Sequence, residues 1–130
     1  MPAMFEPGEY YDIELIPGVA LRAGRMGGAA LAGHPGATPV MNIDEFYSLW
    51  RSLKLIGEER SKGEYRYATG ADVVNVISRS RSAPIELRTF AGELLLILTP
   101  VQLDALLAAL DRRFATCDST AEFYNRIALN

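Results

Sequence analysis

The alternation of apolar and polar positions predicts a pair of strands near the start of the chain. Residues 11–15 have the sequence YDIEL, which shows the two-residue period of a half-buried strand. Pro17 and Gly18 follow, and they supply the fixed φ and the positive φ that a type II turn requires. Residues 24–39 are rich in Gly, Ala and Pro and carry few large apolar side chains, so we expect a loop or an extended arm there.

A change to helical spacing predicts the first helix over about residues 42–56. Asn42 and Glu45 form a capping-box pair at its start. Gly57 marks its expected end, because glycine enters the left-handed conformation of a helix terminus without steric penalty. The apolar residues are spaced three and four apart and share one face: Ile43, Phe46, Tyr47, Trp50 and Leu53.

Residues 64–98 show the alternation and turn signals of an antiparallel meander. Its strands are expected at Glu64–Thr69, Val73–Ser82, Ile85–Phe90 and Leu94–Leu98, with a tight turn at Ala91-Gly92. The last of these segments is apolar throughout, a pattern typical of strands buried on both faces. We therefore expect it to be central in the sheet.

Two more helices are predicted at about residues 100–114 and 120–128. Thr99 and Gln102 form a capping box around Pro100, and proline at the first helical position costs no hydrogen bond. Ser119 and Glu122 form a second capping box.

Together these elements predict an α+β fold. We expect an antiparallel β-meander sheet packed with about three amphipathic helices, plus an N-terminal β-hairpin at an edge and a Gly/Ala-rich arm. The hairpin and arm would occupy residues 1–40, and the α+β core domain would occupy residues 41–130. The helices and the apolar strand present more apolar surface than one sheet face can cover, which favours a homo-oligomer.

Composition narrows the functional classes. The chain has 130 residues, of which 49% are hydrophobic and 22% charged, with a formal net charge of −3. It therefore lacks the basic field that attracts nucleic acid or anionic membranes over long range. The single cysteine, Cys117, excludes an intrachain disulfide framework. With no signal-peptide pattern and no apolar run approaching the ~20 residues that span a bilayer, we expect a cytoplasmic protein without membrane contact.

The chain shows no recognisable catalytic or metal-binding motif. His34 has no second histidine or cysteine at ligand spacing, so we expect no metal and no other cofactor. Cys117 lies beside Asp118, whose carboxylate would raise the pKa of the thiol and discourage nucleophilic use. The glycines of residues 24–28 lack the lysine and the following helix of a phosphate-binding loop. A catalytic site assembled from dispersed residues is left open, but a non-enzymatic protein is favoured.

The most suggestive cluster is basic. In the expected strands Arg79 and Arg81 would share one face, and Arg88 would lie on the neighbouring strand. Arg66, between Tyr65 and Tyr67, adds a cation beside aromatic rings, a combination suited to phosphate contact and base stacking. The other interpretation is a sheet edge that charge protects from aggregation.

These patterns favour a small, oligomeric assembly or protein-interaction subunit of the kind found in larger particles, whose partner is itself or another protein. The alternative is a nucleic-acid-binding module that uses the sheet surface carrying Arg66, Arg79, Arg81 and Arg88.

Overall fold

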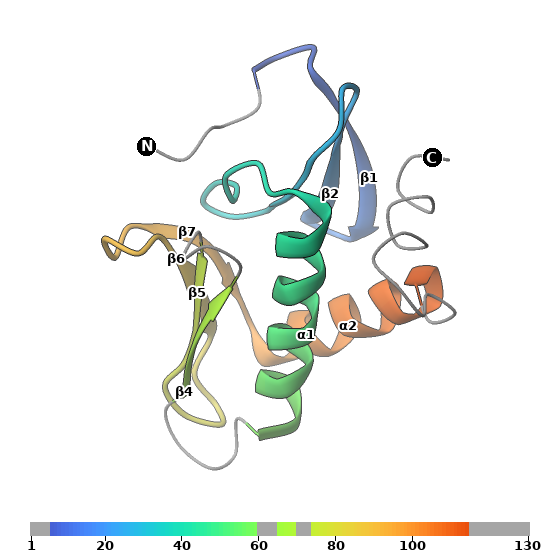
Figure 1. The fold of residues 1–130 in the computed structure, drawn as a ribbon. Coiled ribbons are helices and arrows are strands. Elements are labelled where there is room, and N and C mark those ends of the chain that lie inside the picture. Colours follow the sequence, from blue (N-terminus) through green and yellow to red (C-terminus); the bar gives the residue numbers. More distant parts are fainter. Residues whose placement is uncertain (1–5, 60–64, 70–73, 115–130) are drawn as a thin grey trace.

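The fold is a mixture of helices and antiparallel sheets, as the sequence predicts (Figure 1). The computed structural model describes residues 6–59, 65–69 and 74–114. Within these residues there are two helices rather than the expected three, and the helix predicted at 120–128 lies outside them. The strands form two separate sheets, of three and four strands.

The first sheet has the order β1-β2-β3, with β1 at Tyr10–Ile16, β2 at Val19–Gly24 and β3 at Ala29–Ala32. All its pairings are antiparallel. The sequence predicts the first two strands at an edge of the meander, but they belong instead to this separate three-stranded sheet. Gly18 has a φ of 86° in the turn between them, as a type II turn requires.

The expectation that residues 24–39 form an extended arm is wrong for β3. Leu31 pairs with Leu21 of β2 and is fully buried. The other edge of β3 is also bound, because the Leu31 N–H donates to Thr38 Oγ1 at 3.0 Å and Met41 exchanges two backbone hydrogen bonds with Ala29. Backbone bonds and close packing of small residues thus hold a segment that has few large apolar groups.

The second sheet is the predicted meander, with the order β4-β5-β6-β7. Its strands are β4 at Tyr65–Thr69, β5 at Val74–Ser78, β6 at Ile85–Arg88 and β7 at Leu94–Leu98. The prediction that the last segment is central is wrong, because β7 is the final strand in the order. Its outer edge is covered by the turn after β3: Ile97 N donates to His34 O at 2.8 Å, and Gly36 N donates to Leu95 O at 3.0 Å.

Both helices begin at the predicted capping boxes. Helix α1 spans Ile43–Glu59, preceded by reciprocal hydrogen bonds between Asn42 and Glu45. Helix α2 spans Pro100–Phe114, with the same exchange between Thr99 and Gln102.

Gly57 does not end α1, because the helix continues to Glu59. A β-carbon at position 57 would lie only 2.8 Å from Leu107 Cδ1 of α2. The glycine therefore lets the two helices approach closely and does not terminate the first.

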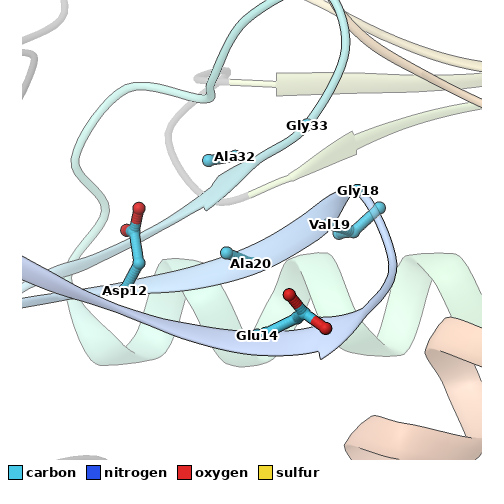
Figure 2. Close-up of a pocket in the computed structure, with 7 residues that line it drawn as sticks. All are labelled: Asp12, Glu14, Gly18, Val19, Ala20, Ala32 and Gly33. Carbon is cyan, nitrogen blue, oxygen red and sulfur yellow. The ribbon is translucent and has the colours of Figure 1, made fainter.

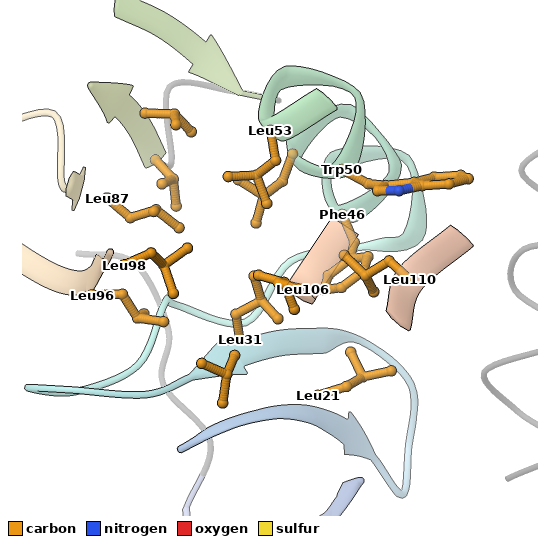
Figure 3. Packing of buried hydrophobic residues seen from close by; sticks show 14 of the residues in the cluster. Leu21, Leu31, Phe46, Trp50, Leu53, Leu87, Leu96, Leu98, Leu106 and Leu110 are labelled. Carbon is orange, nitrogen blue, oxygen red and sulfur yellow. The ribbon is translucent and has the colours of Figure 1, made fainter. Parts of the chain in front are cut away.

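A single hydrophobic cluster joins the two sheets and the two helices (Figure 3). Helix α1 contacts α2, the β3 strand and the β4–β5 pair, while α2 also contacts β1 and β7. Figure 1 shows α1 between the four-stranded sheet and the β1–β2 pair. The cluster draws on both sides of position 40, including Leu21 and Leu31 on one side and Leu87 and Leu106 on the other. The division at residue 40 stays a prediction.

Candidate interaction surfaces

The four arginines singled out in the sequence occupy different kinds of backbone. Arg79 and Arg81 were expected in a strand, but β5 ends at Ser78, so the two-residue period does not relate them. Ser80 turns the chain, since its Oγ and its carbonyl oxygen both accept from Ala83 N. Arg88 ends β6, and Arg66 in β4 is paired in register with Ile77 of β5.

Glu86 of β6 joins two of these arginines on the outer face of the four-stranded sheet. Arg79 Nε lies 3.0 Å from Glu86 Oε2, and Arg88 Nη2 lies 2.6 Å from Glu86 Oε1. Arg88 Nη1 also donates to Gly92 O at 2.8 Å. Arg88 is therefore tied both to its own strand and to the β6–β7 turn.

These contacts determine the charge of the surface. The hydrogen bond from Arg79 lowers the pKa of Glu86, burial opposes this effect, and the hydrogen bond and charge of Arg88 lower the pKa further. Glu86 is thus a carboxylate at neutral pH, and it neutralises part of the positive charge of both arginines. Arg81 remains an exposed side chain in the 79–84 loop.

Next to this ion-paired group is a hollow of about 380 Å³, here called the arginine hollow. Phe90, in the β6–β7 turn, borders this hollow and is 74% exposed. The guanidinium groups and the ring thus lie on one surface. The lining residues are Asn75, Ile77, Arg79, Arg88, Thr89, Phe90 and Gly92.

A second hollow, of about 470 Å³, lies on the outer face of the three-stranded sheet and is here called the acidic hollow (Figure 2). Ala20 is paired with Glu14 on one side and with Ala32 on the other, so the three residues form a row across the strands. The small side chains on β2 and β3 leave this part of the surface hollow, and the carboxylates of Asp12 and Glu14 border it from β1. The lining residues are Asp12, Glu14, Gly18, Val19, Ala20, Ala32 and Gly33.

The two carboxylates of the acidic hollow differ in their surroundings. Asp12 accepts a hydrogen bond from Arg22 Nε at 3.2 Å, and the Arg22 guanidinium also lies 4.5 Å from the centroid of the Tyr10 ring. Glu14 is exposed and forms no ion pair with the described residues. Glu14 also borders a hollow with Arg112 and Arg113 of α2, without an ion pair to either among the described residues.

The described residues show no assembled metal site. Among them, no group of three or more His, Cys, Asp or Glu side chains is placed to hold a metal ion. His34 is exposed, and its backbone carbonyl is used in the contact with β7. Cys117 lies outside the described residues. No helix in the described ranges is both long and apolar enough to cross a membrane.

Comparison with known proteins gives no family for this chain. No protein-family model, curated protein or solved structure matches it. Its function must therefore be argued from its own surfaces.

Two features of these surfaces were not recognised in the sequence. The sequence pattern predicts Phe90 as the last residue of a strand. Its position next to the Ala91-Gly92 turn is the signal that could have placed this large apolar residue in the turn instead. The acidic hollow depends on the pairing of Glu14, Ala20 and Ala32, and no local pattern specifies that register.

Proposed function

We propose that this chain is a non-enzymatic assembly subunit, whose copies associate through the surface around Phe90. The observation that carries the proposal is the exposure of Phe90, 74%, at the rim of a hollow that also contains Arg79 and Arg88. Aromatic and arginine side chains are enriched at protein interfaces and among the residues that contribute most binding free energy.

The state of the arginines supports a protein partner. A protein interface tolerates guanidinium groups that are already paired, because their planar faces and aliphatic stems still provide contact area. A polyanion gains most from unpaired cations, and Glu86 reduces the gain available from Arg79 and Arg88.

The test is the mass of the protein in solution over a range of concentrations, measured by light scattering or sedimentation. The proposal expects wild type to exceed the monomer mass and Phe90→Ala to move the equilibrium toward monomer. Val101→Ala is the matched control, because Val101 is 77% exposed and lines neither hollow. A wild type that stays monomeric at its highest soluble concentration, or a Phe90→Ala variant that associates like wild type, overturns the proposal.

Single-stranded nucleic acid is the second candidate, and the specific observation that favours it is the exposed Phe90 ring next to guanidinium groups. Bases stack on such rings while cations contact the phosphates. A labelled single strand titrated at roughly 50 mM salt tests this binding. Glu86→Gln is the informative variant, since it removes the competing carboxylate and should strengthen binding. No binding by wild type or by Glu86→Gln excludes this candidate.

A further inference from the structure

We infer that the contact between copies is head-to-tail: the Phe90 side chain of one copy inserts into the acidic hollow of the next. This inference rests on the proposed function, and it identifies the surface that receives Phe90. It is based on the shapes and charges of the two hollows.

The shapes are complementary. Phe90 projects from a turn, and its ring is mostly exposed. The acidic hollow is lined by the small residues Gly18, Ala20, Ala32 and Gly33, and its volume is about 470 Å³. An open hollow with a floor of small side chains leaves room for a bulky one, and covering it with an aromatic ring removes apolar surface of both partners from water.

The charges are complementary as well. Glu14 lies at the acidic hollow without an ion pair among the described residues, and the Asp12 side chain is 43% exposed. On the other surface, the Arg79 side chain is 49% exposed and Arg81 is exposed in the adjoining loop. Inserting Phe90 would bring guanidinium groups toward carboxylates, so opposite charges would meet around an apolar centre.

The two surfaces belong to different sheets, with Phe90 following β6 and the acidic hollow spanning β1 to β3. A contact between unlike surfaces is heterologous: a pair of copies retains one unused surface of each kind, and the assembly grows into a ring or an open chain. A second copy of this chain is therefore the occupant to which we assign the acidic hollow.

A complementation experiment tests the direction of the contact. Phe90→Ala removes the inserted ring and leaves the acidic hollow intact, whereas Ala20→Phe fills the acidic hollow and leaves Phe90 intact. A head-to-tail contact predicts that each variant alone loses association and that an equimolar mixture forms a one-to-one dimer that grows no further. Near-UV circular dichroism and thermal unfolding of each variant establish that the variant is folded.

Charge provides the second measurement. Glu14→Lys should associate more weakly than wild type. Added salt should weaken the association of wild type, because it screens the attraction between exposed charges. Glu58→Lys, an exposed change on α1 away from both hollows, is the matched control.

The possible outcomes separate this inference from the proposed function. Association that is lost in Phe90→Ala but retained in Ala20→Phe overturns the inference and leaves the assembly role standing. A mixture that stays monomeric, although both variants are folded, also overturns the inference. A monomeric wild type overturns the assembly role itself.

Discussion

Gly33, which follows β3, lies so close to Leu96 of β7 that a β-carbon at position 33 would be 2.8 Å from Leu96 Cδ2. Leu96 is fully buried, so its side chain cannot move outward to make room. The absence of a side chain at position 33 is therefore a condition for the junction of the two sheets.

This relationship predicts the effect of adding one methyl group. Gly33→Ala should lower the free energy of unfolding by about 1–3 kcal/mol, the usual cost of overpacking a core. Gly36→Ala is the control in the same turn, because the nearest atom to its β-carbon would be Leu95 O at an ordinary 3.5 Å. Denaturant titrations of both variants measure the difference, and equal stabilities would contradict the close contact.

Leu31 and Leu106 test whether the three-stranded sheet belongs to the same cooperative unit as the helices. Both side chains are fully buried in one cluster, so each change to alanine should cost roughly 2–5 kcal/mol. Thermal unfolding of both variants should show one transition, shifted in each. If residues 1–40 unfold independently, Leu31→Ala will leave the main transition where it is in wild type.

Ser78 is a buried polar residue whose removal should not harm the fold. The residue is fully buried at the end of β5, and its Oγ has no hydrogen-bond partner in the described part of the chain. An unpaired buried hydroxyl costs on the order of 1–3 kcal/mol, so Ser78→Ala should leave stability unchanged or raise it within that range. Ser80→Ala removes an acceptor for Ala83 N and should instead lower stability. A marked loss in Ser78→Ala would contradict this interpretation.

Glu86 should make stability depend on pH in the acid range. Its pKa is lowered in the folded protein, chiefly by the hydrogen bond from Arg79, so the unfolded chain takes up the proton more readily. The stabilisation is therefore complete above the ordinary glutamate pKa of about 4.3, and it is lost as pH falls from there through the folded pKa.

Glu86→Gln should accordingly be less stable than wild type at neutral pH, and the difference should shrink as the solution is acidified. Glu93→Gln, which removes an exposed carboxylate from the same hairpin, is the control for a change in net charge. Urea titrations at several pH values measure both effects. A constant difference between Glu86→Gln and wild type across this range would show that the ion pairs contribute no pH dependence.

The sequence predicted the elements whose signals are local. The capping residues Asn42 and Thr99 fix the starts of both helices, and the alternation within residues 64–98 predicts the meander, because each signal involves neighbours in the chain. The sequence predicts a strand where the loop with Arg79 and Arg81 lies. The alternation of serine and arginine is the same whether or not Ser80 turns the chain through its hydrogen bond from Ala83 N.

The parts that sequence reasoning missed depend on contacts between distant segments. Residues 29–32 have the sequence AALA, which is too small and uniform to favour a strand. Their pairing with β2 and with residues 38–41 supplies the missing stabilisation. The acidic hollow follows from the same long-range register, so it could be found only in the folded chain.

The turn at residues 34–36 also limits how this protein can be recognised. A free strand edge is a template on which another chain can add a strand of its own. At β7 the chain's own turn occupies this edge, because Ile97 N donates to His34 O and Leu95 O accepts from Gly36 N. Strand addition is therefore closed on this side of the four-stranded sheet, and a partner that approaches there must recognise side chains rather than backbone.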